Sequence, residues 1–520
     1  MRTRPNAFSK KGVVSSSSIQ SSLIGAKVLE SGGNIVDAAI ATSATLCVTQ
    51  NNMCGLGGDT FILLKLDGKP VIDLNGSGRA FNSMTIDHFL NRGISQLPPR
   101  GKDAVLTVPG LVRAWEDINK KYGTMEAKDL LKYAYGLARN GFPVTQNYVE
   151  SIEMSSRYLG GFENWKSIFM KNNSILTPGT VFKQDNLADT FESMISDGLS
   201  SFYEGHLADR IVNGLNELGV DISSDDMRKH ESTFQEPVST NFNGFNVYET
   251  APNSQAATVI LWLNIIDSVS ANPTLHDILR SGQVAYSQRD RLITDPASLP
   301  LPSSFSTKEF AREVFTNSSS PRVTDVGSGD KGDTTYFSIT DTDGNSISVI
   351  QSNYMGFGSG IVPKGTGLVL QNRGSYFSLD PRHHNSLKPG KRTFHTLCAG
   401  MIEDETGYIA SVGSMGGDIQ PQLHVQLMLG LMKDRADPQS VIDKPRWAFP
   451  YTIYEKPNSF ITESDNYVEE IRGIFPNRKV NNIGFSSQLG HAQITARLNN
   501  GTVTGGSDPR GDGVSIPITF

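Results

Sequence analysis

The sequence predicts a protein of mixed α and β structure, with helices concentrated early in the chain and strands late. Apolar residues recur at helical spacing in several segments before about residue 264. After residue 334, polar and apolar residues alternate as they do in strands. A polar, glycine-rich segment at residues 321–333 separates the two parts. This order fits two domains or one layered body, because periodicity alone does not distinguish them.

Four early segments predict helices. They are residues 18–33, 34–49, 111–123 and 127–141. The first stops at Gly32 and Gly33, and Asn34 directly after it is a suitable N-cap for the second. Each of the other two ends on a glycine, a common helix terminator. We therefore expect the first part of the chain, including most of residues 112–264, to be helical.

Three later segments predict strands, at residues 334–340, 346–352 and 367–372. The first two form a hairpin around the sequence DTDGN, and the loop length decides which residues face each other. A two-residue turn would pair Thr334 with Asn353. A three-residue loop at 342–344, with Gly344 left-handed, would place Ser352 opposite Thr334. We favour the second, because it also gathers several serine hydroxyls on the same face.

Composition excludes several classes of protein. The 520 residues carry a formal net charge of −6 and no dense run of lysine and arginine, so we expect no nucleic acid partner. No window approaches the ~20 apolar residues of a membrane span, and the N-terminus lacks the apolar core of a secretory signal. We therefore expect a cytoplasmic protein without a membrane partner. Cys47, Cys54 and Cys398 have no paired spacing and are expected to be buried thiols.

Two sequence features resemble metal-binding sites, but we interpret neither of them as one. Adjacent His383 and His384 have no nearby carboxylate pair, so we assign them to a surface loop. The DTDGN loop departs from an EF-hand, because the twelfth position counted from Asp341 is Ser352 and not glutamate. We expect no metal and no cofactor.

Thr334 is most simply the first threonine of a strand, and it also has a chemical interpretation. A threonine hydroxyl is a weak nucleophile until a base removes its proton. If the bond between Asp333 and Thr334 were cut, Thr334 would gain an α-amine with a pKa of roughly 7.7–8.0 beside its own hydroxyl. Nucleophile and base would then belong to one residue. The branched side chain limits χ1, which would help to aim the hydroxyl.

The stretch from Gly332 to Asn372 resembles the sequence around the nucleophilic threonine of the γ-glutamyltranspeptidase family. Other stretches similar to the family, in the same order along the chain, are ESGGNIVDAAIATSATLCVTQNNMCGLGGDTFILL, VPGLVRAW, YGLARNGFPV and GSMGGDIQPQLHVQLMLGLM. The resemblance covers about residues 12–513. It implies an α+β fold of the N-terminal-nucleophile hydrolase type, a four-layer αββα sandwich of two stacked, mainly antiparallel sheets.

The resemblance also implies a precursor that cleaves itself. Thr334 would attack the carbonyl of Asp333, and water would release the resulting ester. Chains 1–333 and 334–520 would remain one folded body, as a heterodimer or as a dimer of heterodimers. The earlier indication of a domain boundary would then mark a processing site.

In turnover, the resemblance implies that Thr334 attacks a substrate amide while its α-amine carries the proton. Ser352 stands where the family has a threonine that touches the nucleophile. Gly416 and Gly417 match the family's oxyanion pair, and glycine amides just before a helix are suited to that role.

Substrate recognition departs from the family pattern. The family holds the substrate's α-carboxylate with an arginine and its α-amine with an aspartate. Arg79 is displaced by several residues from the expected place, where Asn75 or Gly76 falls. Candidate substrate-binding residues in the other two matching regions are Asn372, Arg373, Ser375, Tyr376, His395 and Thr396. Because Ser375 and Tyr376 replace the acidic pair, a substrate ammonium group would lose its counter-ion.

Together these features predict an amide hydrolase or acyltransferase that forms an acyl-enzyme on Thr334. Its small-molecule substrates would be γ-glutamyl compounds such as glutathione, or related acyl amides. The region around RGSYF looks more like the divergent, cephalosporin-acylase-like branch of the family. Arg373 and Arg392 could hold a carboxylate or form structural ion pairs, and the sequence leaves both open. The alternative function is a catalytically silent protein that binds a small molecule on the same fold.

Overall fold

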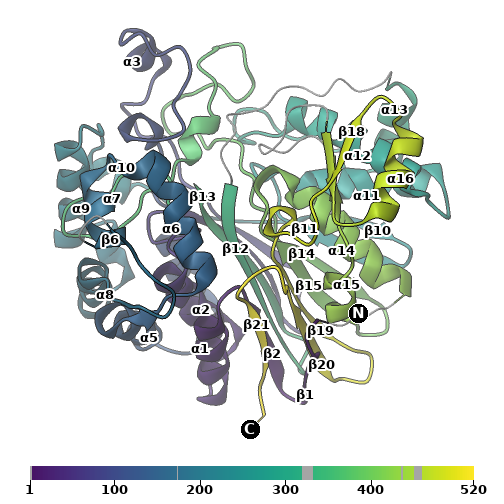
Figure 1. Ribbon diagram of the computed structural model, residues 1–520, viewed down its shortest axis with the longest axis horizontal. Coiled ribbons are helices and arrows are strands. Elements are labelled where there is room, and N and C mark those ends of the chain that lie inside the picture. The colour runs from purple at the N-terminus through teal and green to yellow at the C-terminus, as the bar shows by residue number, and fades with distance from the viewer. Residues whose placement is uncertain (1–2, 172–173, 319–331, 435–436, 450–458, 520) are drawn as a thin grey trace.

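The computed structural model describes residues 3–171, 174–318, 332–434, 437–449 and 459–519 (Figure 1). Two seven-stranded sheets lie face to face, and helices cover the outer face of each. The expected αββα sandwich is confirmed. The polar segment predicted at residues 321–333 lies outside the described residues except at its last two positions.

The hairpin sheet, which contains both strands of the predicted hairpin, has the order β21-β2-β12-β13-β3-β4-β9. Its strands are β2 (Gly12–Ser16), β3 (Asp59–Lys65), β4 (Ile72–Gly76), β9 (Thr233–Gln235), β12 (Gly332–Asp341), β13 (Ser346–Met355) and β21 (Val514–Pro517). The second sheet has the order β1-β20-β19-β15-β14-β11-β10. Its strands are β1 (Ala7–Ser9), β10 (Val238–Phe242), β11 (Phe245–Glu249), β14 (Gly400–Asp404), β15 (Ile409–Ser414), β19 (Ala492–Arg497) and β20 (Val503–Ser507). Every neighbouring pair in both sheets is antiparallel.

Helices α1 (Ile19–Glu30) and α2 (Ile35–Thr49) cover the hairpin sheet, and α2 packs directly on β12 and β13. Asn34 caps α2 through a reciprocal capping box with Asp37, as the sequence predicts. The other helices on this side are α3 (Ile86–Leu90), α4 (Leu111–Tyr122), α5 (Ala127–Asn140), α6 (Gln146–Leu159), α7 (Glu163–Phe169), α8 (Asp185–Asp197), α9 (His206–Glu217) and α10 (Ser224–Arg228). The helices on the side of the second sheet are α11 (Ala257–Val269), α12 (Leu275–Leu292), α13 (Lys308–Thr316), α14 (Gln420–Asp434), α15 (Pro438–Ile442) and α16 (Asp465–Ile474).

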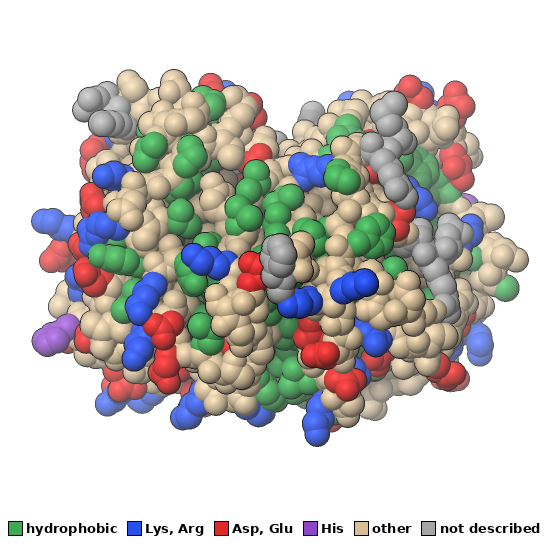
Figure 2. All heavy atoms as spheres, turned by 90° about the horizontal axis from the view of Figure 1, so that it is seen from below, with side chains coloured by type: hydrophobic (Ala, Val, Ile, Leu, Met, Phe, Trp, Pro, Cys, Tyr) green, Lys and Arg blue, Asp and Glu red, His purple; other side chains and the backbone are tan. Residues whose placement is uncertain are grey.

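Small sheets complete the fold. Their strands are β5 (Phe142–Pro143) with β8 (Val181–Phe182), β6 (Met170–Lys171) with β7 (Ser174–Ile175), and the group β16 (Trp447–Ala448), β17 (Ser459–Thr462) and β18 (Lys479–Asn482). No helix in the described part of the chain has the length and apolar composition to span a membrane. Acidic and basic side chains are interspersed on the face shown in Figure 2. Cys47, Cys54 and Cys398 are buried thiols, as predicted.

The prediction that the first part of the chain is helical is wrong for the small strands β5 to β8 and for seven strands of the two large sheets. That part supplies β2, β3, β4 and β9 to the hairpin sheet and β1, β10 and β11 to the second sheet. Strand β3 is buried over almost its whole length, so its sequence DTFILLK does not alternate. Because both sheets mix early and late strands, the change in character along the sequence marks no boundary between domains.

The strand predicted at residues 367–372 is also absent. The amide of Leu370 donates to the carbonyl of Ile361, that of Gln371 to Gly57, and that of Asn372 to Asn353. Three acceptors in different parts of the chain form no ladder, so this buried apolar run is an extended connection.

The three-residue loop of the hairpin is confirmed. Thr340 pairs with Ser346 and Thr335 with Gln351, which leaves residues 342–344 in the loop, and Gly344 has a φ of 95°. The polar face of β12 is turned toward the second sheet, where the Thr340 hydroxyl lies 2.8 Å from that of Thr495 on β19. The apolar face carries Phe337 and Ile339 into the core beneath α2. The hydroxyl-lined face of the hairpin is therefore buried between the two sheets.

Candidate active site

Thr334 and Ser352 meet at an irregularity of the hairpin. Thr335 pairs with Gln351 and Asp333 pairs with Tyr354, so Ser352 and Asn353 together oppose Thr334. The Thr334 hydroxyl donates to Ser352 Oγ over 3.2 Å. Both side chains are buried. The predicted juxtaposition of the two hydroxyls is thus present in the structure.

The Ser352 hydroxyl connects three groups at this point. It donates to the carbonyl oxygen of Asp333 over 2.7 Å and accepts from the backbone amide of Tyr354 over 2.7 Å. With the bond from Thr334, its hydrogen-bonding capacity is filled. A donor on the Asp333 carbonyl polarises that carbonyl, next to which the Thr334 hydroxyl is held.

The glycine pair lies at the start of a helix. Gly416 and Gly417 have φ values of 146° and 56°, and a 3₁₀ turn, Gly417–Ile419, leads into α14 and packs against β12. Positive φ at both positions favours glycine. In the described part of the chain, neither glycine amide donates a hydrogen bond. Two donors are therefore available near β12, the strand that carries Thr334.

Asp418, next to the glycine pair, is tied to the predicted substrate region. Its carboxylate accepts from the hydroxyl of Tyr376 over 2.7 Å and lies 3.4 Å from a guanidinium nitrogen of Arg289. Gln255 donates to the carbonyl oxygens of Gly417, over 2.9 Å, and Thr396, over 2.8 Å. These bonds fix the glycine pair against the segment that carries the candidate residues.

Asp59 is a site residue that the sequence reasoning missed. It pairs with Ser352 across β3 and β13, and its Oδ2 lies 3.2 Å from His395 Nε2. Because His395 Nδ1 accepts from the amide of Leu397, the ring proton lies on Nε2 and is donated to Asp59. Burial raises the pKa of Asp59 to about 6, although hydrogen bonds from Gln371 and other donors act to lower it. Burial also holds the pKa of His395 well below its usual range.

Arg373 is buried at the other side of this network. One guanidinium nitrogen donates to the Thr396 hydroxyl over 2.8 Å, whereas Nε and Nη2 have no hydrogen-bond partner in the described part of the chain. The guanidinium carbon lies 4.3 Å from the ring centre of Tyr354 and 5.6 Å from that of Tyr376. The Asp59 carboxylate interacts with the Arg373 guanidinium only through the electrostatic attraction between their charges.

The remaining candidates have structural contacts. Asn372 holds Met355 through a bond from the Met355 amide to Oδ1, over 3.1 Å, and the Ser375 hydroxyl donates to the carbonyl of Asn372. The Arg79 side chain bonds to the carbonyl of Gly390 and is 37% exposed, so the structure does not bring it to Thr334. Arg392 donates to the carbonyls of Ser77 and Glu231 and to the hydroxyl of Thr233, and thereby holds loops together. Asn75, the alternative near Arg79, bonds to Asn253 and Ser77.

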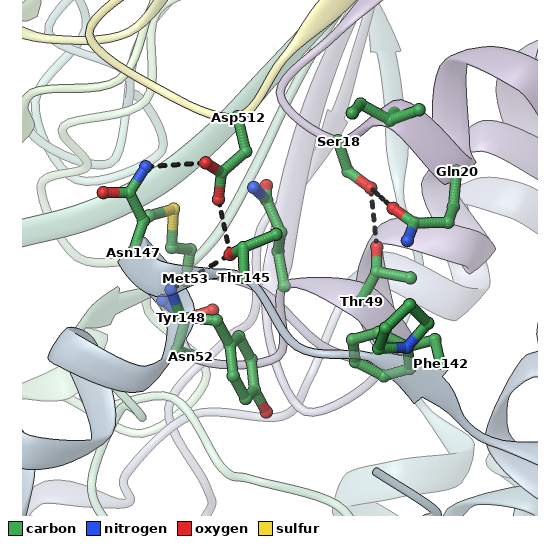
Figure 3. A pocket seen from close by; sticks show the side chains of 13 residues that line it. Ser18, Gln20, Thr49, Asn52, Met53, Phe142, Thr145, Asn147, Tyr148 and Asp512 are labelled. Atoms are coloured by element: carbon green, nitrogen blue, oxygen red, sulfur yellow. Dashed lines mark hydrogen bonds between the residues drawn. The ribbon is translucent and has the colours of Figure 1, made fainter. Parts of the chain in front are cut away.

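A cavity of about 410 Å³ adjoins Asp333. Helix α6 lines one side, and Met415 and His491 line the other. A smaller pocket, drawn in Figure 3, shares Met53 and Asn147 with this cavity. Asp512 in that pocket accepts from Thr145 and Asn147, both over 2.7 Å. The bond before Thr334 therefore borders open space.

No metal site is formed by the described side chains, since no three His, Cys, Asp or Glu residues are suitably grouped among them. His383 and His384 stack on each other at 4.3 Å in a loop on the surface, as the sequence suggests.

Known proteins resemble this chain over nearly its whole length. A family model described as gamma-glutamyltranspeptidase matches residues 21–518. The glutathione hydrolase-like YwrD proenzyme of Bacillus subtilis (strain 168) is 35% identical, with 98% of each chain covered. The oxamate amidohydrolase proenzyme of Klebsiella pneumoniae is 31% identical, covering 94% of this chain and 95% of the relative.

Among solved structures, the cephalosporin acylase from Bacillus halodurans matches with a TM-score of 0.91 at 31% identity. The match covers 99% of this chain and 97% of the acylase, and it identifies the sandwich as an N-terminal-nucleophile hydrolase fold. The chain belongs to the gamma-glutamyltranspeptidase family.

Proposed function

We propose that this protein is a self-processing amide hydrolase or acyltransferase whose nucleophile, Thr334, is released by cleavage of the bond after Asp333. The observation that carries the proposal is the Ser352 hydroxyl, which lies 3.2 Å from the Thr334 hydroxyl and 2.7 Å from the Asp333 carbonyl oxygen. Attacking group, polarised carbonyl and leaving nitrogen thus belong to adjacent residues on one strand.

The cleavage proceeds through an ester. Thr334 Oγ attacks the Asp333 carbonyl carbon, its proton passes to the Thr334 nitrogen, and the C–N bond breaks as the C–O bond forms. Water then hydrolyses the ester, which leaves a carboxylate on Asp333 and a free α-amine on Thr334. The hydrogen bond from Ser352 stabilises negative charge on the carbonyl oxygen during the attack.

In turnover, the new α-amine of Thr334 takes the hydroxyl proton and later donates it to the leaving amine. The acyl group is held on Thr334 Oγ as an ester, and water or an acceptor amine releases it. The amides of Gly416 and Gly417 are the donors for the oxyanion. The cleaved chains form a heterodimer in which the nucleophile is the first residue of the second chain.

The substrates proposed are γ-glutamyl compounds such as glutathione, or related acyl amides. The names of two relatives, a glutathione hydrolase-like proenzyme and an oxamate amidohydrolase proenzyme, support amide hydrolysis and precursor processing. Their difference in named substrate supports an acyl donor broader than γ-glutamyl.

The test is a pair of isosteric variants analysed by intact mass under denaturing conditions. Wild-type protein is expected to give two chains that separate before Thr334. Thr334→Val removes the hydroxyl, keeps the shape, and is expected to give one uncleaved chain without amidase activity. Thr335→Val removes the hydroxyl at the next position, which lies 3.4 Å from the Gln351 carbonyl oxygen, and is expected to cleave normally. An uncleaved wild-type chain would contradict the proposal and favour a silent binding protein.

A further inference from the structure

Arg373 differs from three other buried arginines in having no ion pair, and from Arg392, which also has none, in having two guanidinium nitrogens without a hydrogen bond among the described residues. Arg289, Arg446 and Arg510 each form an ion pair with Asp or Glu. Arg373 is 1% exposed, and no carboxylate among the described residues forms an ion pair with it. Its Nε and Nη2 have no hydrogen-bond partner among the residues that the structure describes. A buried charge without a counter-ion is costly, and the faces of aromatic rings compensate for only part of that cost.

The unpaired atoms have the geometry of a ligand site. Nε and Nη2 form one edge of the guanidinium plane, where two parallel N–H groups match the two oxygens of a carboxylate. The third nitrogen is fixed by its bond to Thr396 over 2.8 Å. The Arg373 guanidinium is thus held in place by one nitrogen, while its Nε and Nη2 edge is left for an anion.

Arg373 lies between the parts of the proposed active site. Its ring contact Tyr354 follows Ser352 by two residues and donates to the Ser352 hydroxyl. The side-chain amide of Gln255 donates to the carbonyl of Thr396, the residue that is bonded to Arg373, and also to the carbonyl of Gly417. Single side chains therefore connect Arg373 to the hairpin that carries Thr334 on one side and to the glycine pair, Gly416 and Gly417, on the other.

We propose that Arg373 binds a carboxylate on the acyl group of the substrate, so that the enzyme prefers amides whose acyl part carries a carboxylate and no ammonium group. This inference rests on the proposed function, since it names the substrate class of the same site. It assigns to Arg373 the carboxylate contact that Arg79, in its exposed position, does not make.

The rejection of an ammonium group follows from the nearby carboxylates. Asp59 already accepts from the amides of Gly78 and Gly110, as well as from Gln371 and His395. Asp418 is engaged by Tyr376 and Arg289. Neither carboxylate is left for a cationic ligand, and the positive charge of Arg373 repels one.

Access to Arg373 lies past two tyrosines. The ring centres of Tyr354 and Tyr376 lie 4.8 Å apart, and both residues line a surface cavity of about 600 Å³. Tyr354 has a φ of 80°, unfavourable for a bulky residue, and its backbone pairs with Asp333 in the uncut chain. Cleavage after Asp333 removes the covalent tie that holds this pair, so the assays use cleaved protein.

The first measurement compares p-nitroanilides that differ only in the charged group. Glutaryl-p-nitroanilide carries a terminal carboxylate, valeryl-p-nitroanilide has a methyl group in its place, and γ-glutamyl-p-nitroanilide adds an ammonium group. Wild type is expected to favour glutaryl over valeryl in kcat/KM by about 10- to 100-fold, the range for a hydrogen-bonded charge pair. A higher kcat/KM for γ-glutamyl than for glutaryl would overturn the exclusion of ammonium.

The second measurement uses variants. Arg373→Gln is expected to lose the preference for glutaryl over valeryl, mainly through KM, and Arg373→Lys to keep part of it. Arg382→Gln removes a cation that is 88% exposed in the same segment and is expected to keep the wild-type ratio. If Arg373 had a merely structural role, Arg373→Gln would lower kcat/KM for both substrates equally. The proposal would be overturned if Arg373→Gln kept the wild-type ratio of glutaryl to valeryl kcat/KM, or if Arg79→Gln lost it.

Calorimetry with glutarate separates this inference from the proposed function. Cleaved wild type is expected to bind glutarate, and Arg373→Gln to bind it at least about tenfold more weakly. Equal binding by the two proteins contradicts the carboxylate site even if no substrate is turned over. An uncleaved wild-type chain contradicts the proposed function, whatever Arg373 does.

Discussion

Ser352 is the residue on which the proposed self-cleavage depends most closely. A single hydroxyl accepts from Thr334 and from the Tyr354 amide, and donates to the Asp333 carbonyl. The three partners come from both strands of the hairpin, at the place where the register shifts. The irregularity therefore brings one hydroxyl into contact with both the Thr334 hydroxyl and the Asp333 carbonyl, the two groups that react in the proposed cleavage.

Removal of this hydroxyl is expected to slow self-cleavage. In Ser352→Ala the Asp333 carbonyl loses its donor, and the loss of one such donor to an oxyanion typically costs about 10²- to 10³-fold in rate. Ser352→Thr keeps the hydroxyl and is expected to cleave. A time course of cell-free synthesis, followed on denaturing gels, gives the rate before cleavage is complete.

The matched control for that experiment lies on the same strand. The hydroxyl of Ser348 lies 2.7 Å from that of Tyr336 and is buried between the sheets. Ser348→Ala should therefore cleave at the wild-type rate. Equal rates in wild type and Ser352→Ala would remove Ser352 from the mechanism.

At the scale of elements, the hairpin could be predicted because its sequence alternates and its loop contains glycine. These two signals gave the pairing of Thr335 with Gln351 and, with it, the approach of Ser352 to Thr334. Asp59 could not be found in this way, since it reaches Ser352 from β3, far away along the chain. Strands buried on both faces, such as β3, show no alternation, and the unpaired edge of Arg373 depends on contacts that no local pattern encodes.

Strand β4 carries a carboxyl group that is expected to make stability depend on pH. One oxygen of Asp73 accepts from the amide of Ala251 over 2.7 Å and from Gln235 over 2.8 Å, while the other has no partner within the described ranges. Burial raises the pKa of Asp73 to about 7. The folded state therefore binds this proton more tightly than the unfolded state, and stability is lost as pH rises from about 4 to about 7.

Asp73→Asn is expected to remove this loss. The amide oxygen keeps both hydrogen bonds. As pH rises from 5 to 8, the free energy of unfolding of the variant should therefore increase by roughly 2–3 kcal/mol relative to that of wild type, at 1.36 kcal/mol per pKa unit. Urea unfolding in an uncleaved Thr334→Val background measures this for a single chain. Asp129→Asn, at an exposed ion pair with Lys132, should lack the gain. Parallel pH profiles for Asp73→Asn and its parent would show that Asp73 does not titrate in this range.

For the whole molecule, the proposed cleavage site does not coincide with a boundary between domains. The segment before Thr334 supplies β2, β3, β4 and β9 to the hairpin sheet, and the segment after it supplies β12, β13 and β21. Strand β12 lies between β2 and β13, so the proposed cleavage would place the new chain end inside a sheet built from both segments. The second sheet mixes them in the same way.

The two chains are therefore expected to stay together after cleavage. Their separation would expose the ladder between β12 and β2 and that between β13 and β3, together with the apolar face under α2. Size-exclusion chromatography of cleaved wild type should give one peak that contains both chains, with the elution volume of uncleaved Thr334→Val. Chain 334–520 expressed alone should be insoluble, and co-expression with 1–333 should restore a soluble heterodimer. Two peaks in native buffer would contradict the shared sheets, because each chain would then have to complete a core of its own.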